Sequence, residues 1–339
     1  MEPTKLATTL DKIASDTGFS GGIHVRQAER DVYQKAFGYA ERSNQIPNTL
    51  ATRFGIASGT KFFTALAVGK LVEAGKLGFS SKVAELIPWD FQHYSREITV
   101  RHLLTHTSGI PDYFDEEKVD DFDNFTVEVP WYELKGPRDY LAVFPDEAMK
   151  FPPGERFSYS NSGYILLGVL IEESSGMPYR EFVEKEIFAP VGMERSGYFA
   201  MNRLPEGTAF GYVEEEGGWR TNIYNLPIIG ASDGGAYTTL HDIANLWDAF
   251  WNYRILSKEI VETFTAPYVK TTVDSADKFY GHGIWIRTGT RSDTEEYILG
   301  EDAGVSFYSG VTRAKDLLVT VMSNTTEGAW PILRAIYER

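Results

Sequence analysis

A serine and a lysine lie three residues apart at the start of an apolar segment. The segment FGIASGTKFFTALAVGKLVEAGKL spans residues 54–77 and contains Ser58-Gly59-Thr60-Lys61, which has the form S-x-x-K. Residues three apart share one face of a helix, so Lys61 would lie beside the Ser58 hydroxyl. The apolar residues that follow would desolvate the lysine and lower its pKa, which lets the amine accept the serine proton. We therefore interpret Ser58 as a nucleophile, Lys61 as its base, and the Ser58 N–H as an oxyanion donor.

Structural interpretations of this motif remain open at the level of sequence. Ser58 could simply cap the helix while Lys61 reaches solvent. A second match to S-x-x-K, Ser275-Ala276-Asp277-Lys278, lies in a polar stretch without a helical pattern. We interpret this second match as a chance occurrence, because it lacks the apolar helix that the chemistry requires.

A tyrosine followed two residues later by asparagine is the second candidate for proton transfer. Of the nineteen tyrosines, only Tyr159, in Tyr159-Ser160-Asn161, has this spacing. Glycine and proline in FPPGERF place it on a loop before a helical segment. A nearby lysine ammonium would favour the phenolate, so Tyr159 is expected to act as general base and then acid. Asn161 is expected to bond Lys61 and a substrate amide; the structural alternative is a Ser/Asn helix cap after a packed tyrosine.

A competing nucleophile motif lies later in the chain. Gly230-Ala231-Ser232-Asp233-Gly234 matches the G-x-S-x-G nucleophile elbow. That motif requires a helix directly after the serine, whereas the next helical segment begins only near Thr239, where Thr239 and Asp242 fit a capping box. Ser232 is therefore the weaker candidate.

The histidines do not form a metal-binding pattern. His102 and His106 have the spacing of metal ligands, but leucine follows His102 where the zinc pattern H-E-x-x-H needs glutamate. His241 and His282 are interpreted as surface or rim residues, with His282 a minor candidate for the cleft. We expect neither a metal nor a cofactor.

Length and composition restrict the class of protein. The 339 residues, 42% of them hydrophobic, can form a large core in one or two domains. The formal net charge of −15 argues against nucleic acid and anionic membrane surfaces as partners, and no apolar run reaches the length of a membrane span. Cysteine is absent, which excludes disulfides and thiolate metal sites. The expected partner is a small-molecule or peptide substrate, and the oligomeric state is left open.

Strand patterns lie near both ends of the chain. GGIHVRQAERDVYQKAFGYA predicts two strands joined by a polar turn, and GIWIRT, EEYILG and DLLVTVMSN predict strands near the C-terminus. Between them, ITVRHLLTHTSGIPDY predicts a helix ending in a Gly-Pro break, and YILLGVLIEESSG a helix closed by Gly176. We predict an α+β fold with an antiparallel sheet that is built from both chain ends and flanked by helices.

The same patterns suggest two domains. The predicted sheet domain comprises residues 1–76 and 227–339, and residues 77–226 form a mostly helical inserted domain, with the active site in the cleft between them. Residues 112–123 carry seven carboxylates and one lysine, and are expected to form an exposed loop.

These motifs resemble the serine β-lactamase and penicillin-binding-protein-like family. Within it, the branch with S-x-x-K followed by Y-x-N includes class C β-lactamases, D-alanyl-D-alanine carboxypeptidases, D-aminopeptidases and family VIII esterases. The resemblance covers nearly the whole chain, including ITVRHLLTHTSGIPDY, FPPGERFSYSNSGYILLG, IFAPVGM from Ile187 and GGAYTT from Gly234. It implies a β-lactamase/transpeptidase-like fold and an acyl-enzyme on Ser58, with Lys61 and Tyr159 handling the protons.

The third motif of that family is K-T-G or H-x-G, on the sheet strand that lines the site. We match it to Gly300-Glu301-Asp302-Ala303-Gly304, which puts Glu301 where the family has a cation and Ala303 where it has glycine. The resemblance then implies that the second oxyanion donor is the backbone N–H of Gly304. Glu301, Asp302 and Ala303 are expected to contact the substrate.

Acids at this position predict a substrate without an essential carboxylate, and one that favours a positive charge. The alternative is that both acids point away, or that Arg287 or Arg313 supplies a cation. We predict a serine hydrolase that cleaves an ester or amide, of esterase or D-amino-acid peptidase type.

Other functions remain as alternatives. They are β-lactamase or penicillin-binding D-alanyl-D-alanine carboxypeptidase activity, a hydrolase that uses Ser232 with a His/Asp pair, and a ligand-binding or sensor protein that acylates without turnover. No signal-peptide pattern is seen, so a cytoplasmic location is expected for the sequence as it stands, and an extracytoplasmic one if a leader precedes it.

Overall fold

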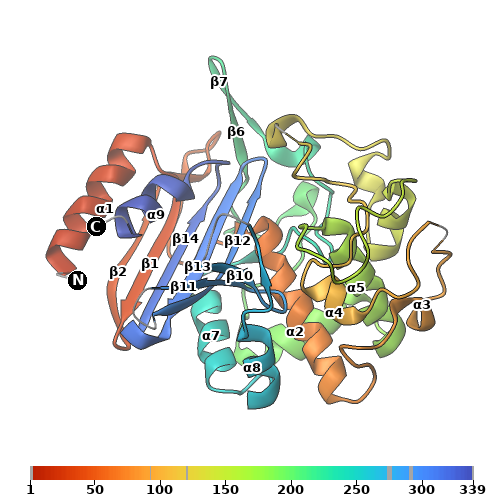
Figure 1. The fold of residues 1–339 in the computed structure, drawn as a ribbon. Coiled ribbons are helices and arrows are strands. Elements are labelled where there is room, and N and C mark those ends of the chain that lie inside the picture. Colours follow the sequence, from red (N-terminus) through yellow and green to blue (C-terminus); the bar gives the residue numbers. More distant parts are fainter. Residues whose placement is uncertain (1–2, 92, 120, 273–276, 290–292, 338–339) are drawn as a thin grey trace.

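Strands from both ends of the chain form one sheet in the computed structural model, which describes residues 3–91, 93–119, 121–272, 277–289 and 293–337 (Figure 1). Within these residues the sheet has eight strands in the order β2-β1-β14-β13-β12-β11-β10-β9, and each neighbouring pair is antiparallel. The strands are β1 (Gly21–Gln27), β2 (Arg30–Phe37), β9 (Val269–Lys270), β10 (Lys278–Tyr280), β11 (Trp285–Thr288), β12 (Thr294–Asp302), β13 (Val305–Thr312) and β14 (Leu317–Ser323). The predicted α+β fold is confirmed.

The remaining elements are helices and short two-stranded ribbons. The α-helices are α1 (Pro3–Thr17), α2 (Thr60–Glu73), α3 (Val83–Leu86), α4 (Val100–Leu104), α5 (Asn161–Ser175), α6 (Tyr179–Val183), α7 (Leu240–Trp251), α8 (Lys258–Thr265) and α9 (Ala329–Tyr337). The ribbons pair β3 (Tyr39–Glu41) with β4 (Ile46–Pro47), β5 (Phe54–Gly55) with β8 (Tyr237–Thr238), and β6 (Tyr212–Glu215) with β7 (Gly218–Thr221).

The first two strands join the ends of the chain. β1 pairs with β2 on one side and with β14 on the other, so Gly21 lies opposite both Phe37 and Ser323. The turn between β1 and β2 places Ala28 and Glu29 at φ of 51° and 58°. Two left-handed residues give a turn whose twist matches that of the paired strands. The two strands predicted from the N-terminal sequence are therefore present.

β13 is a strand that the sequence patterns did not reveal. It lies at the centre of the sheet, between β12 and β14. Nearly all of its residues are buried, so polar and apolar residues do not alternate along it. A strand covered on both faces lacks the period of two by which half-buried strands are recognised.

Helices cover both faces of the sheet. α1 and α9 pack on one face in an apolar cluster that includes Leu10, Val319 and Ile332. Helices α2, α5 and α7 contribute to a larger cluster on the opposite face. In Figure 1, α1 and α9 lie to the left of the sheet, and α2, α4 and α5 to the right of it. This arrangement brings β12 into contact with the 3₁₀ turn Ala57–Gly59 that leads into α2.

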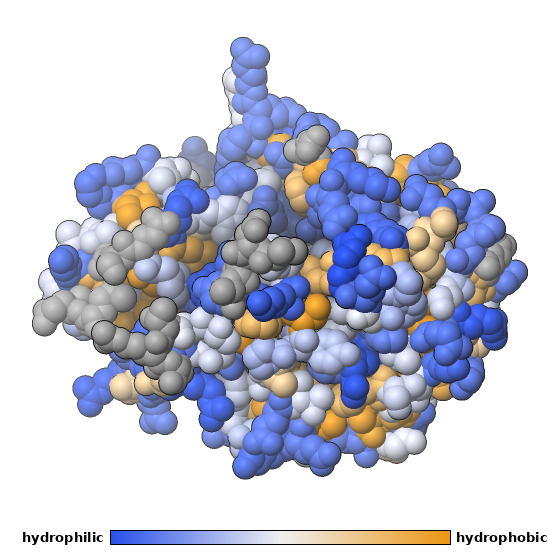
Figure 2. Space-filling view, in the orientation of Figure 1, coloured by the Kyte–Doolittle hydropathy of each residue, from blue (hydrophilic) through white to orange (hydrophobic). Residues whose placement is uncertain are grey.

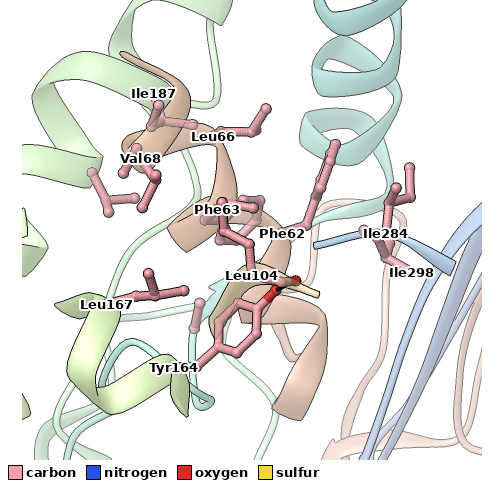
Figure 3. Close-up of a cluster of buried hydrophobic side chains, with 14 of the residues drawn as sticks. Phe62, Phe63, Leu66, Val68, Leu104, Tyr164, Leu167, Ile187, Ile284 and Ile298 are labelled. Atoms are coloured by element: carbon pink, nitrogen blue, oxygen red, sulfur yellow. Dashed lines mark hydrogen bonds between the residues drawn. The ribbon is translucent and has the colours of Figure 1, made fainter. Parts of the chain in front are cut away.

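α2 is buried on all sides. Every residue from Thr60 to Gly69 is buried, Lys61 among them. Figure 3 shows Phe62 beside Ile284 and Ile298 of the sheet region. The Phe62 ring also stacks on Trp247 of α7 at 5.5 Å between centroids. A helix surface that is buried and mainly apolar fixes the start of α2 and removes water from around its lysine.

The two predicted helices of the middle region differ in how well their ends were predicted. α5 ends at Gly176, which adopts φ of 73° as the C-cap, as predicted. α4 ends at Leu104, five residues before Gly109, so the prediction of a helix reaching the Gly-Pro break was wrong. His106 adopts φ of 55° and the N–H of Thr107 donates to the His102 carbonyl oxygen at 2.9 Å. A left-handed residue with such a bond is a helix stop, here made by histidine.

A projecting hairpin on the surface is mostly hydrophilic. The β6–β7 hairpin projects from the molecule in Figure 1, and Figure 2 shows that it is hydrophilic over most of its length. Glu214, Glu215 and Glu216 lie at and beside its tip. Within the described residues, no helix combines the length and the apolar character needed to cross a membrane.

The sequence-based division at residues 76 and 226 stays a prediction. The region between them is mostly helix and loop, and all strands of the main sheet lie outside it. The acidic loop was predicted less accurately: Asp112 and Asp115 are each only 6% exposed, so this loop is partly buried.

His282 was predicted at the surface or at the rim, and this was wrong. It lies in the turn between β10 and β11, is 2% exposed, and is surrounded by the rings of Phe79, Phe264 and Tyr268. Burial, with help from the positive charge of Arg101, lowers the pKa of the imidazole to about 4. The folded protein therefore holds this histidine neutral at pH values at which the unfolded chain would protonate it.

The pH dependence of stability should carry this signature. Because the folded pKa of His282 lies below the usual histidine value of 6.5, its contribution to stability is fully present above pH 6.5. That contribution is lost as the pH falls toward 4, by up to about 3 kcal/mol. We expect His282→Phe to flatten that part of the pH profile of unfolding free energy in urea. Equal slopes for wild type and His282→Phe would contradict the assignment.

Candidate active site

Ser58 lies in the 3₁₀ turn that precedes α2. The residue before it, Ala57, adopts φ of 45°, which is strained for a residue with a side chain. Three hydrogen bonds hold this conformation: Thr60 Oγ1 and the Gly235 N–H donate to the Ala57 carbonyl oxygen at 2.7 and 3.3 Å, and the Ala236 N–H donates to Thr60 Oγ1 at 3.0 Å. The strained turn directs the Ser58 side chain into the cleft described below.

Lys61 is held by three oxygen atoms. Its Nζ lies 2.9 Å from Ser58 Oγ, 2.7 Å from Asn161 Oδ1 and 2.6 Å from the carbonyl oxygen of Asp233. The asparagine and carbonyl oxygens can only accept hydrogen bonds. A neutral amine has two hydrogens for these two oxygens, and its lone pair then faces the third partner, the Ser58 hydroxyl. As an ammonium, Lys61 donates to all three oxygens; as a neutral amine, it keeps a lone pair for the Ser58 hydroxyl.

The side chain of Asn161 is oriented by a buried carboxylate that the sequence analysis missed. Asn161 Nδ2 donates to Asp112 Oδ2 at 3.2 Å and to the Phe114 carbonyl oxygen at 2.9 Å, which turns Oδ1 toward Lys61. Asp112 also accepts the N–H groups of Asn161 and Ser162, both at 2.7 Å, at the start of α5. One carboxylate thus caps α5 and fixes the asparagine.

Burial sets the protonation of Lys61. The side chain is 2% exposed, and this burial lowers the pKa of the ammonium below its usual value. The nearby carboxylates of Asp233, Glu116 and Asp112 oppose the shift without reversing it. Lys61 is thus a better base near neutral pH than an exposed lysine would be.

Tyr159 lies beside Lys61, with Lys61 Nζ 4.9 Å from the centre of its ring. The ring packs against His106 at 4.3 Å and stacks on Trp285 at 6.1 Å. Burial, followed by the charge of Glu116, raises the pKa of the phenol well above its usual range. The expectation that the lysine would favour the phenolate was therefore wrong, because burial and a nearby acid outweigh it. This direction favours the neutral phenol form of Tyr159 at neutral pH.

β12 approaches the Ser58 turn at Gly300. A Cβ atom at this position would lie 2.2 Å from the Ile56 carbonyl oxygen and 2.6 Å from the Ser58 nitrogen. Only glycine allows the strand to come this close. Gly300, and not the position of Ala303, is the glycine that packs against the nucleophile. The place two residues earlier, where the resembled motif has a cation, is then Ile298, a buried core residue (Figure 3).

This register corrects three of the predictions for the third motif. The Gly304 N–H donates to Thr326 Oγ1 at 2.9 Å, so it is not an oxyanion donor. Glu301 lies on the α9 side of the sheet, where Trp330 is a hydrogen-bond partner. Ala303 is 1% exposed and does not line the cleft. Side chains alternate along a strand, so a shifted register moves a predicted contact to the opposite face.

Asp302 is the member of the motif that lines the cleft with Ser58. The cleft encloses about 840 Å³, part of it open to solvent. Eight aromatic side chains line it, among them Tyr113, Phe114 and Trp131. Asp233 and Asp302 are the charged side chains of this lining within the described chain. The site is therefore aromatic and acidic.

Neither arginine named as a source of positive charge reaches the cleft lining. Arg287 pairs with Glu295 at 3.1 Å, and Arg313 stacks on Trp251 with 4.5 Å between guanidinium carbon and ring centre. Both are absent from the residues that line the cleft in the described part of the chain.

The other candidates for catalysis or metal binding are Ser232, the pair His102 and His106, and the second S-x-x-K match. Ser232 is fully buried, and its Oγ packs so closely against Gly168 that a Cβ atom added there would lie only 2.2 Å from it. A serine enclosed in this way is not an exposed nucleophile, so the elbow interpretation of Ser232 is wrong. His102 and His106 each accept a backbone N–H at Nδ1, from Thr99 at 3.2 Å and from Ser160 at 3.0 Å. The second S-x-x-K match begins at Ser275, which lies outside the described residues.

Comparison with known proteins identifies the family. Residues 6–337 match the profile of the Beta-lactamase family. The chain belongs to the Beta-lactamase family. The resemblance inferred from the motifs is thereby confirmed, and the proteins of this family are generally serine hydrolases. The match covers nearly the whole chain, so it includes both the sheet and the helical region.

Several known proteins are similar to this chain. Penicillin-binding protein 4* of Bacillus subtilis (strain 168) is 30% identical over 298 residues, which cover 83% of this chain and 62% of that protein. This chain thus spans less than two thirds of that relative. A solved structure titled penicillin binding protein from Bacillus halodurans is 42% identical, with a TM-score of 0.91 over 97% of this chain and 99% of that chain. A D-stereospecific amidohydrolase from Streptomyces sp., 21% identical with a TM-score of 0.81 over 98% of each chain, shares the fold.

Gly300→Ala tests the contact between β12 and the nucleophile in this Beta-lactamase-family protein. The new Cβ would meet backbone atoms at 2.2 to 2.8 Å, so Ser58 or the strand must move. Because small displacements of reacting groups are costly, we expect a loss of about 10² or more in kcat/KM on an activated ester. Gly78→Ala is the control, since its Cβ would meet only Ser81 Oγ at 3.5 Å. A Gly300→Ala protein with wild-type kinetics would show that the contact does not matter.

Proposed function

We propose that the protein is a serine hydrolase that cleaves an ester or amide through a covalent acyl-enzyme on Ser58. The observation that carries this proposal is the orientation of Lys61, which two acceptor oxygens aim at the Ser58 hydroxyl. Burial and membership of a family of serine hydrolases support the same assignment.

The proposed proton transfers follow from the lowered pKa of Lys61 and the raised pKa of Tyr159. Ser58 Oγ attacks the substrate carbonyl carbon while its proton passes to the neutral Lys61 amine. When the bond to the leaving group breaks, the leaving atom takes this proton through the neutral phenol of Tyr159. Water then attacks the acyl carbon and gives up a proton to the Tyr159 and Lys61 pair. The pair returns a proton to Ser58 Oγ as the bond to the acyl group breaks and the acid product leaves.

Two backbone N–H groups are proposed to stabilise the oxyanion. One is that of Ser58. The second is that of Glu301, for two reasons. The two-residue hairpin closes with Asp302 opposite Val305, and N–H groups alternate between the two sides of a strand, so Glu301 faces the edge away from β13. Gly300 brings that edge next to the Ser58 nitrogen.

Penicillin recognition is the second candidate, because a relative that is 30% identical is named a penicillin-binding protein. Penicillins and D-alanyl-D-alanine ends carry a carboxylate near the reacting bond. The described cleft lining offers carboxylates and no cation. We therefore place ester or amide hydrolysis of other substrates first.

A covalent probe tests the nucleophile. We expect a fluorophosphonate to add once, at Ser58, as seen by intact-protein mass spectrometry and peptide mapping. Ser58→Ala should lose the adduct and reduce p-nitrophenyl ester hydrolysis by several orders of magnitude. Ser232→Ala is the matched serine control and should keep both. An adduct on Ser58→Ala protein would refute the proposal.

Tyr159→Phe tests the acid role. p-Nitrophenolate can leave without being protonated, whereas an amine leaving group must receive a proton. Loss of the phenol should therefore lower the rate of hydrolysis by about 10² or more on an amide and by much less on the p-nitrophenyl ester. The ring and its packing on Trp285 are kept, so the melting temperature should change little. Similar losses on both substrates would assign Tyr159 another role.

The pH profile tests Lys61. The base form is the active one, so kcat/KM on a neutral ester should rise with pH through a pKa that lies below that of a free lysine. A rate that is unchanged from pH 6 to pH 10 would contradict Lys61 as the base.

A further inference from the structure

The charge of the cleft indicates which substrates it selects. Resting on the proposed hydrolase function, we propose that the acyl donor carries an ammonium group beside an aromatic or apolar side chain, and that the Asp302 carboxylate holds this ammonium group. Asp302 would be a specificity-determining residue, distinct from the residues that carry out the bond cleavage.

The faces of β12 single out Asp302 from its acidic neighbour. Ile298, Gly300 and Asp302 alternate onto the face toward α2, where Ile298 is buried and Gly300 touches the Ser58 turn. Glu301 lies on the α9 face, near Glu327 and Trp330. Only Asp302 among the acids of this strand end therefore lines the space in which a substrate would lie.

Among the described residues, no cationic side chain lines the cleft to receive a substrate carboxylate. The described lining contains no lysine, arginine or histidine side chain. Lys61 lies behind it, with its Nζ engaged by Ser58, Asn161 and the Asp233 carbonyl. A substrate carboxylate would bring a third negative charge toward Asp233 and Asp302, with no cation to pair with it. Such an approach is unfavourable in a partly desolvated site.

Asp302 has capacity to bind a donor. Within the described chain its carboxylate has no hydrogen bond or ion pair, whereas the Asp233 carboxylate accepts a hydrogen bond from Tyr113. An ammonium group supplies three donors and the opposite charge, so it suits a half-buried carboxylate.

The aromatic walls favour the same ligand. Aromatic faces attract cations and also provide apolar surface for a neighbouring side chain. Phe114, Phe125 and Trp131 line the cleft with Asp302 and Ser58. An acyl group with an amine and an aromatic side chain would therefore match the acidic and the apolar part of the cleft at once.

Protonation of Asp302 should link this selectivity to pH. Burial raises the pKa of its carboxyl to about 7; the charged groups that act on it are Lys61, Asp233 and Glu116, together with Glu301 from the other face of the strand. Cation binding needs the carboxylate form, so the preference for a cation should weaken as the pH falls below 7.

Binding to Ser58→Ala protein tests the proposal without turnover. The probes are 2-phenylethylammonium, a cation between pH 6 and 8, and its neutral analogue 2-phenylethanol, measured by calorimetry. We expect the cation to bind about ten- to a hundredfold more tightly at pH 8, less so at pH 6, and this preference to fall near one in Ser58→Ala/Asp302→Asn. Glu327→Gln in the same background is the charge-matched control and should keep the preference.

Kinetics of the wild type give the second measurement. Phenylalanine p-nitroanilide should exceed 3-phenylpropanoyl p-nitroanilide in kcat/KM at pH 7, and Asp302→Asn should remove the difference. Equal binding of the two probes, or a preference that survives Asp302→Asn, overturns the inference. A Ser58 adduct and neutral-ester turnover without cation preference would refute this inference alone, whereas cation preference without any Ser58 adduct would refute the hydrolase proposal alone.

Discussion

The rest of the site depends on the hydrogen bonds made by the buried amine of Lys61. Burying an ammonium in an apolar helix is costly, so burial lowers the pKa of Lys61, and loss of the proton relieves the cost. The three oxygens around Nζ then decide how the amine is used. Two of them come from segments far from α2 in sequence, Asn161 at the start of α5 and the carbonyl of Asp233. The fold therefore has to bring three separate segments to one nitrogen atom.

The central sheet explains how this convergence is held. β12 pairs with β13, and β13 with β14, which in turn pairs with the N-terminal β1. This continuous ladder supports the strand end that presses Gly300 against the Ser58 nitrogen. On the other side, the apolar packing around Phe62 fixes the start of α2 (Figure 3). The nucleophile thus lies between two rigid elements, which allows the strained φ of Ala57 to persist.

Local spacing was enough to predict part of this site from the sequence. Ser58 and Lys61 are one helical turn apart, and the loop with Tyr159 and Asn161 has unusual spacing, so these residues could be named before their contacts were known. Asp112 could not, because a carboxylate in an acidic segment resembles a solvated loop until the start of α5 is placed upon it.

The strand end was predicted in the wrong register for a different reason. Nothing in the order Gly300 to Gly304 distinguishes which glycine touches the nucleophile, and two glycines were available. The glycine of the motif was matched to position 303, three residues from Gly300, and because successive residues change face this odd offset also exchanged Asp302 for Glu301 as the acid that points into the cleft. The fold class was easier to predict, since it needed only strand patterns at both ends of the chain, and the buried strand β13 could be missed without changing it.

The charges around Lys61 also connect substrate binding to base strength. Asp302 is one of the carboxylates that hold the pKa of Lys61 up against the larger effect of burial. An ammonium group bound at Asp302 would offset that carboxylate, lower the pKa of Lys61 further and increase its base form. A substrate carboxylate would have the opposite effect on Lys61, in addition to being repelled. The sign of the substrate charge therefore enters twice, so discrimination in kcat/KM should exceed discrimination in binding alone.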